Sequence, residues 1–174
     1  MEVHVSDCRA DDHRTRVVDD APGQQPALDL IELLFFAYRD FVGDADRRLA
    51  ADGFGRAHHR VLHFVSRNPG MTVAGLLDLL RITKQSLNRV LKELLEKDYV
   101  AQREGEADRR QRLLYVTEAG AALVHELAVL QSARINRALA ECAPGARIHV
   151  VDFLGAMVDW PAPEGRRAVT REKG

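Results

Sequence analysis

Cysteine is scarce in this chain, as are other features typical of secreted or membrane proteins. Only Cys8 and Cys142 occur in 174 residues, far apart in the sequence, so no disulfide framework is expected. No apolar run approaches the roughly 20 residues of a membrane-spanning helix, and the polar first residues lack the apolar core of a signal peptide. We therefore expect a cytoplasmic protein that does not contact a membrane.

The short motifs of common enzyme classes are also missing. The sequence contains no Gly-rich phosphate loop, no Cys-x-x-Cys, no His-Glu-x-x-His and no Gly-x-Ser-x-Gly. Nothing in the spacing of Ser, His and Asp indicates a catalytic triad. We therefore expect neither an enzyme nor a bound cofactor.

Hydrophobic periodicity indicates one domain between two polar tails. Residues 1–26 and 161–174 show no helical or strand period, which predicts disordered tails. Between them the period is mostly helical. The expected helices cover about 28–51, 57–67, 73–80, 84–97, 117–142 and 148–160, and the expected strands cover 100–104 and 112–116.

Local signals mark the boundaries of these elements. Asn68-Pro69-Gly70 predicts a turn. Thr72 and Thr83 are expected to be helix N-caps, and Asp98 is expected in the left-handed conformation after its helix. The helical period places these residues inward: Val61, Leu62 and Val65; Leu87, Val90, Leu91 and Leu94; and Leu123, Leu127, Leu130, Ile135 and Leu139.

This order predicts a mainly α protein with a small β-hairpin wing. Residues 54–120 correspond to a winged helix-turn-helix, within a domain spanning 27–160. The flanking helices, about 28–51 and 118–160, are too apolar for a lone domain of this size. Pairing with a second copy of the chain is the simplest way to bury them, so we expect dimerisation helices there.

Charge is distributed unevenly, although the net charge is only −1. Residues 81–112 contain nine bases and six acids, a net charge of +3, which leaves −4 for the rest of the chain. A local basic surface is sufficient for contact with nucleic-acid phosphates.

Polar side chains share one face of the expected helix 84–97. Arg can pair bidentately with guanine, and Asn or Gln with adenine, so this face is suited to reading bases in the major groove. The alternative is an ordinary solvated helix face. The candidate DNA-contacting residues at this helix are Thr83, Lys84, Gln85, Ser86, Asn88, Arg89 and Lys92.

A charged loop joins the two expected strands. It carries Arg109 and Arg110 at its expected tip, with Arg112 just beyond. A guanidinium at such a tip can enter the minor groove, where negative potential is concentrated. Asp108 can hold Arg110 by a bidentate ion pair. The alternative is a solvated charged hairpin.

The stretch from Asp108 to Gly120, with Ile82 to Val100 before it, resembles the MarR family of bacterial transcriptional regulators. It has the family's Asp-x-Arg at 108–110, a hydrophobic strand, and a Thr-x-x-Gly helix start at 117–120. The resemblance implies a homodimer on a palindromic site, usually a repressor released by a small ligand or by cysteine oxidation. It also implies that Arg110 reads the minor groove and that Asp108 orients it. The first long helix has no cysteine, unlike that of the peroxide-sensing members, and Asp98 stands where the family usually has Gly.

Three histidines cluster on the expected second helix. His59 and His63 share one flank, and His58 lies nearer the apolar stripe. The i, i+4 pair has metal-ligand spacing but lacks companion ligands, so packing against the first helix is favoured over metal or haem. A third interpretation is that the three histidines form the wall of a small-molecule effector pocket together with Phe35 and Tyr38.

The sequence therefore predicts a sequence-specific, DNA-binding transcriptional regulator. More finely, it predicts a ligand-responsive repressor that binds a pseudo-palindromic operator as a homodimer. A winged domain that mediates only protein contacts is the rival, but such domains usually lose the basic face that Arg89 and Arg110 retain. A third interpretation, an effector-binding sensor for which DNA binding is secondary, differs from the first only in emphasis. Cys8, despite neighbouring Arg9, and Cys142 are expected to be inert thiols.

Overall fold

The computed structural model describes residues 26–105 and 110–159, which form six helices and three short strands. Along the chain they are α1 (Leu28–Ala50), α2 (Arg56–Arg67), β1 (Met71–Thr72), α3 (Val73–Leu80), α4 (Lys84–Glu96), β2 (Val100–Glu104), β3 (Arg112–Val116), α5 (Glu118–Ala140) and α6 (Ala146–Ala156). The mainly α class with a small β wing is confirmed.

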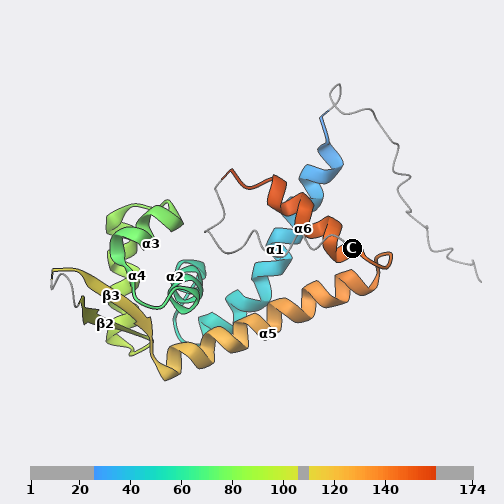
Figure 1. The fold of residues 1–174 in the computed structure, drawn as a ribbon. Coiled ribbons are helices and arrows are strands. Elements are labelled where there is room, and N and C mark those ends of the chain that lie inside the picture. The colour runs from blue at the N-terminus through green and yellow to red at the C-terminus, as the bar shows by residue number, and fades with distance from the viewer. Residues whose placement is uncertain (1–25, 106–109, 160–174) are drawn as a thin grey trace, which may run out of the picture.

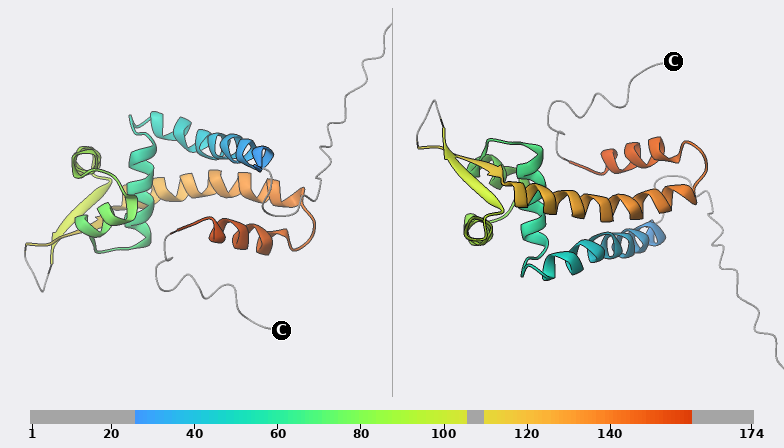
Figure 2. Two further views of the ribbon diagram at one scale, coloured as in Figure 1. Left: turned by 90° about the horizontal axis from the view of Figure 1, so that it is seen from above. Right: turned by 90° about the horizontal axis from the view of Figure 1, so that it is seen from below.

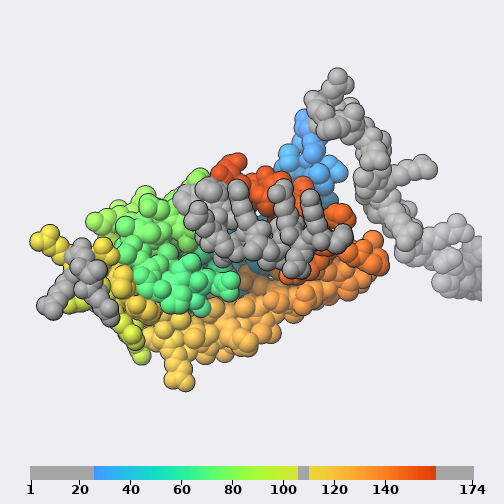
Figure 3. Space-filling model, viewed as in Figure 1, coloured from blue at the N-terminus to red at the C-terminus, as the bar shows by residue number. Residues whose placement is uncertain are grey.

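The helices α2, α3 and α4 and the sheet gather at one end of the molecule (Figure 1). The long helix α5 runs away from this end, and Figure 2 shows α1 and α6 on opposite flanks of α5. The start of α1 projects from the rest of the surface in Figure 3. The winged part is thus attached to a helical part that is open on several sides.

Threonine begins three of the helices in the manner expected of an N-cap. The hydroxyls of Thr72, Thr83 and Thr117 accept hydrogen bonds from the backbone N–H of the residue three positions on, at 3.0, 3.2 and 3.1 Å. Each such cap is worth about 1 kcal/mol. The caps predicted at Thr72 and Thr83 are confirmed.

A third strand joins the hairpin that the sequence predicts. The sheet order is β1-β3-β2, and Met71 of β1 pairs with Leu114 of β3. The chain enters β1 through Gly70, whose φ is +81° and whose N–H donates to the Leu114 carbonyl. The turn at 68–70 was predicted, but a two-residue strand has no period that the sequence could reveal.

One apolar core joins the winged part to the near ends of α1 and α5. It includes the four apolar residues of α4 that the sequence places inward, and their burial is confirmed: Leu87, Val90, Leu91 and Leu94. From the long helices it includes Ala45 and Leu49 of α1 and Leu123 and Leu127 of α5. The predicted inward positions of α2 are likewise confirmed, namely Val61, Leu62 and Val65.

The far halves of the long helices remain exposed in the single chain. Leu130 and Ile135 of α5, which were expected to face inward, are 38% and 42% exposed. The prediction is wrong for one chain because its other helices leave these sides of α5 open, although Arg134 beside Ile135 bonds to Asp44 of α1 at 2.9 Å. The last helix ends at Ala156 and not at Trp160, which lies outside the described residues, and none of its residues is buried.

Within the described ranges, no helix combines the length and apolar character needed to cross a membrane.

Candidate nucleic-acid interface

The helix α4 has two sharply different faces. Leu87, Val90, Leu91 and Leu94 are buried on one side, at 4% exposure or less. On the other side every predicted DNA-contacting residue of the helix is exposed: Lys84, Gln85, Ser86, Asn88, Arg89 and Lys92. The buried leucines fix the rotation of α4, so this polar face must point outward. Packing thus presents a row of donors on the outer surface.

Thr83 and Ser86 are already bonded to each other at the start of α4. The Ser86 N–H and the Ser86 hydroxyl lie 3.2 and 2.9 Å from the Thr83 hydroxyl oxygen. Their role in this structure is to begin the helix. Both residues remain predicted DNA contacts at the end of α4 where backbone N–H groups face outward.

The turn between α3 and α4 contains a feature that the sequence analysis missed. Arg81 ends α3 in the left-handed conformation with φ +51°, which is uncommon for a residue other than Gly. The Arg60 guanidinium of α2 donates to the Leu80 carbonyl at 3.1 Å and so satisfies one of the last acceptors of α3. No local pattern of glycine or asparagine marks this turn.

The wing is held together by side chains on its two strands. Arg112 pairs with Glu104 at 2.8 Å, directly across the register of β3 and β2. The Arg103 guanidinium lies over the Tyr115 ring, 4.8 Å from its centroid. A guanidinium held by Glu104 supports the hairpin, so Arg112 has a structural role beside its predicted DNA contact.

Arg110 is exposed at the turn that leads into β3. Asp108 and Arg109 lie outside the described residues, so the predicted ion pair between Asp108 and Arg110 stays a prediction. The Gly105 N–H donates to the Gln111 carbonyl at 3.1 Å and closes the hairpin just before its tip. The sequence prediction that Arg110 belongs to the outer end of the wing agrees with this geometry.

His58 is a structural residue of α2 in this fold. It is 9% exposed, its ring stacks on Phe54 with centroids 4.7 Å apart, and its Nδ1 accepts the Gly55 N–H. Because Nδ1 is an acceptor, the proton is on Nε2, which donates to Glu93 of α4 at 2.9 Å. Both ring nitrogens are therefore used within the chain.

His59 and His63 have different surroundings. His59 is partly buried near Asp46 of α1, and His63 is exposed with its ring edge-on to Phe64. Phe35 and Tyr38 of α1 are 70% and 57% exposed, and the Arg56 guanidinium lies 5.9 Å from the Tyr38 ring centroid. Among the residues that the structure describes, these aromatic rings of α1 lie open to solvent and not in an enclosed pocket.

Burial lowers the pKa of His59, and the nearby His63 lowers it further, although Asp46 opposes the shift. The unfolded chain therefore binds the proton more tightly than the folded chain, and the free energy of unfolding should fall as pH drops below about 6.5. The H59Q variant should lose part of this decrease. Thermal unfolding of both proteins at pH 5.5 and 7.5 measures it, and equal pH dependence would contradict the assignment.

Metal and thiol chemistry gain no support from the described part of the chain. No group of three His, Cys, Asp or Glu side chains lies close enough there to hold a metal ion. Cys142 is exposed at the end of α5, with its thiol 3.3 Å from the Ala138 carbonyl. Cys8 lies outside the described residues.

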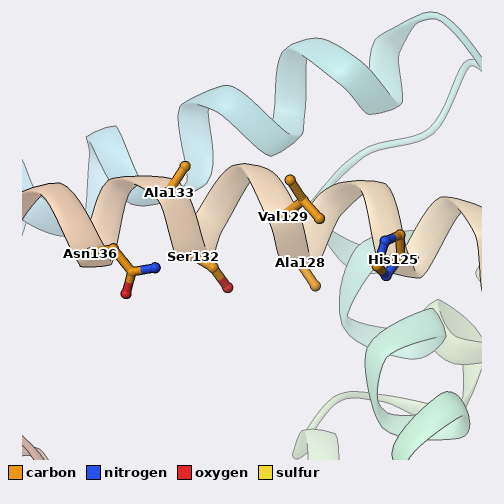
Figure 4. Close-up of a pocket in the computed structure, with 6 residues that line it drawn as sticks. All are labelled: His125, Ala128, Val129, Ser132, Ala133 and Asn136. Atoms are coloured by element: carbon orange, nitrogen blue, oxygen red, sulfur yellow. The ribbon is translucent and has the colours of Figure 1, made fainter.

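An open groove that the sequence analysis did not identify runs along α5. It is lined by His125, Ala128, Val129, Ser132, Ala133 and Asn136. Figure 4 shows several of these side chains, Ser132 and Asn136 among them, pointing away from α1. Small residues at Ala128, Ser132 and Ala133 create the hollow, and these lie on the part of α5 that the core does not cover.

Known proteins are similar to this chain in sequence and in fold. The sequence model of the MarR family matches residues 52–111. The HTH-type transcriptional regulator PetP of Rhodobacter capsulatus is 44% identical over 147 residues, which cover 80% of this chain and 89% of PetP.

Two solved structures with low sequence identity show the same fold. FabT of Streptococcus pneumoniae, in complex with DNA, has a TM-score of 0.68 at 15% identity and covers 76% of this chain and 94% of its own. BpsR of Bordetella bronchiseptica, whose DNA binding is regulated by 6-hydroxynicotinic acid, has a TM-score of 0.58 at 22% identity, covering 74% and 98%.

The winged fold, the outward polar face of α4 and the identity with PetP lead to one conclusion. The expectation that the protein is not an enzyme is confirmed by the family, whose members regulate transcription. The chain belongs to the MarR family of DNA-binding, helix-turn-helix transcriptional regulators.

Proposed function

We propose that this protein is a cytoplasmic, homodimeric repressor that binds a pseudo-palindromic operator and leaves it when a small ligand binds. Each α4 enters a major groove, and the two grooves are separated by one helical turn, ~34–36 Å. Each wing places Arg110 in the adjacent minor groove. The exposure of α4's polar face and of its N-cap supports contacts with bases and phosphates by Thr83, Lys84, Gln85, Ser86, Asn88, Arg89 and Lys92.

The two-faced α4 is the observation that carries this proposal. A helix whose apolar side is almost fully buried cannot turn, so its polar side is fixed in space before DNA arrives. Arg89 and Asn88 on that side have the donor geometry for guanine and adenine. A winged domain that only bound proteins would not need this row of donors beside an arginine-tipped hairpin.

We expect Arg110→Ala to weaken DNA binding by about 1–3 kcal/mol, as the loss of one groove contact does. DNA fragments selected from genomic DNA by the wild-type chain serve as the target. Titration at several salt concentrations measures both affinity and the salt slope, which should become shallower by about one unit if a phosphate contact is also lost.

Arg137→Ala is the matched control, because it removes an exposed arginine near the end of α5, far from the wing. It should bind as the wild type does. Equal affinity of the Arg110→Ala and Arg137→Ala proteins would remove the wing from DNA binding. A wild-type protein without a steep salt slope would favour the module that binds only proteins.

The ligand site is proposed between α1 and α2, with His59, His63, Phe35 and Tyr38 on its wall. His58 was predicted to belong to it, but both of its ring nitrogens are bonded to Gly55 and Glu93. The ligand named for BpsR is a small aromatic acid, and such a molecule suits histidines beside exposed aromatic rings. Since His59 has a lowered pKa, an anionic ligand would bind together with a proton. A ligand wedged there would alter the angle between the two winged parts and release DNA.

We expect the double variant H59Q and H63Q to fold and bind DNA normally but to require more ligand for release. The probe is a panel of hydroxylated aromatic carboxylic acids added to the protein–DNA complex. For a responsive acid, the wild type should release DNA more readily at pH 6 than at pH 8, and the variant should lose that difference. Unchanged release by the variant would leave the two histidines as packing residues.

A further inference from the structure

A polar cluster lies where α1 ends and the winged part begins. We call it the Asp52 joint and define it as Arg48, Asp52, Lys97, Tyr99 and Glu126. The Asp52 carboxylate accepts from Arg48 at 2.6 Å and from the Tyr99 hydroxyl at 3.3 Å, and its backbone carbonyl accepts from the Lys97 ammonium at 2.5 Å. Arg48 also pairs with Glu126 of α5 at 2.6 Å.

The joint connects four parts of the fold: three of them meet at Asp52, and Arg48 adds α5 through Glu126. Arg48 is in α1, Glu126 in α5, Lys97 ends α4, and Tyr99 precedes β2. None of these links follows from neighbouring positions in the sequence, except Arg48 to Asp52, because the others span 45 to 78 residues. The end of the DNA-contacting helix is thereby tied to both long helices.

Aromatic contacts surround the polar atoms and limit their movement. Phe54 packs edge-on against Tyr99 with centroids 5.0 Å apart, and the Lys97 ammonium lies 4.8 Å from the Phe54 centroid. Phe54 also stacks on His58, which holds Glu93 of α4. The segment from Asp52 to His58 therefore contacts α4 at Glu93 and just after its end at Lys97.

We propose that Asp52 and Tyr99 are positioning residues for DNA binding, which fix the angle of α4 relative to α1 and α5 without touching DNA themselves. A helix-turn-helix protein reads bases with the first residues of its recognition helix. Asp52 and Tyr99 lie at the opposite end, beside Lys97. They act by preventing the winged part from tilting about that end.

The chemistry of the joint favours a stiff contact. Burial and the adjacent Asp52 raise the pKa of Tyr99, so its hydroxyl keeps the proton that it donates to the carboxylate. Asp52 receives an arginine on one oxygen and a phenol on the other, so both of its acceptor atoms are occupied by groups on different elements. Gly53, with φ +72°, lets the chain leave the joint beside the Lys97 ammonium.

The positioning role is measured by the distance between α4 and α5 within one chain. Cys8 and Cys142 are first replaced with serine, and nitroxide labels are then attached at Glu96→Cys and Arg137→Cys. Mixing with excess unlabelled chain leaves only distances within a chain. Pulsed electron paramagnetic resonance should give a narrow distribution for the parent protein, a broader or shifted one for Asp52→Asn, and a smaller change for Tyr99→Phe.

Asp40→Asn is the matched control, since it removes the same charge from an exposed position of α1. Its distance distribution should equal that of the parent. Tyr99→Phe keeps the aromatic ring against Phe54 and removes only the hydroxyl, so it should fold even if Asp52→Asn does not. Thermal unfolding shows which of the Asp52→Asn and Tyr99→Phe proteins are folded. If no folded variant changes the distance distribution, the positioning role is excluded.

DNA binding supplies the second readout, and this part rests on the proposed dimeric function. Asp52→Asn should lose about tenfold in affinity for a selected fragment with two half-sites, while its affinity for the same fragment with one half-site scrambled stays the same. Equal losses of affinity on both fragments would mean that Asp52 only stabilises the fold, and would overturn the proposal. A wild type that does not distinguish the two fragments would contradict the dimeric function, whereas the distance measurement would still decide on the joint.

Discussion

Replacing Gly120 with alanine is expected to lower the free energy of unfolding by about 3 kcal/mol or more, as severe overpacking does. A Cβ on Gly120 would lie 2.0 Å from the Tyr99 carbonyl oxygen and 3.1 Å from its carbonyl carbon. Both are backbone atoms, so no side chain can turn away. The first turn of α5 would have to move off the end of α4, breaking the bond from the Thr117 N–H to the same carbonyl.

Urea unfolding followed by circular dichroism measures this loss, and Gly155→Ala is the matched control. Gly155 lies in α6, where an added Cβ meets nothing. Because alanine is the better helix former by about 0.8–1.0 kcal/mol, Gly155→Ala should not destabilise the protein. A Gly120→Ala protein with the wild-type midpoint would mean that α5 does not approach Tyr99 this closely.

Gly120 belongs to a sequence pattern whose physical reason becomes clear only in the structure. The Thr-x-x-Gly pattern at 117–120 was identified only through resemblance to a family. In the structure the Thr117 hydroxyl caps α5 and donates to the Asp98 carbonyl at 2.6 Å. Gly120, which has no side chain, leaves room for the carbonyl of Tyr99, the residue after Asp98. A contact between residues 21 positions apart leaves no period in the sequence.

Local rules predicted most of the winged part. Thr72 and Thr83 were recognised as caps, and Asp98 was expected in the left-handed conformation that it adopts, with φ +58°. The buried face of α4 followed from its helical period, and the exposed face followed from the same period. The position of the candidate DNA-contacting residues therefore required no knowledge of the tertiary fold.

Contacts between distant residues were beyond the reach of the sequence. Arg81 adopts a left-handed turn that its residue type does not indicate, and the bond from Arg60 to Leu80 spans 20 residues. His58 was placed near the core, but its bond to Glu93 was not foreseen. Such pairs depend on how helices pack, whereas periodicity reports only which face of a helix is apolar.

Adding a carboxylate to the exposed apolar faces of α1 and α6 is expected to convert the protein to monomers. Phe35 and Leu154 are 70% and 49% exposed in the single chain, and both lie among further exposed apolar residues. Apolar surface of this extent is typical of a protein interface. The variants Phe35→Asp and Leu154→Asp would bury an unpaired charge in the proposed dimer, which is costly.

Loss of the partner should reduce DNA binding far more than the loss of one contact. The second half-site is bound intramolecularly once the first is occupied, and such linkage raises overall affinity by roughly 10²–10⁴-fold. The monomeric variants should therefore lose a factor of about that size on a fragment with two half-sites. Their affinity for a fragment with one half-site should not change, because α4 and the wing are intact.

Sedimentation equilibrium at micromolar concentration and titration on both fragments check the two halves of this prediction. Ala57→Asp is the control, since it adds the same charge at an exposed residue in the first turn of α2, where the helix dipole favours an acid. It should remain dimeric and bind DNA as the wild type does. A wild type that sediments as a monomer, or a Phe35→Asp protein that stays dimeric, would show that the exposed face of α1 serves a purpose other than pairing two copies of the chain.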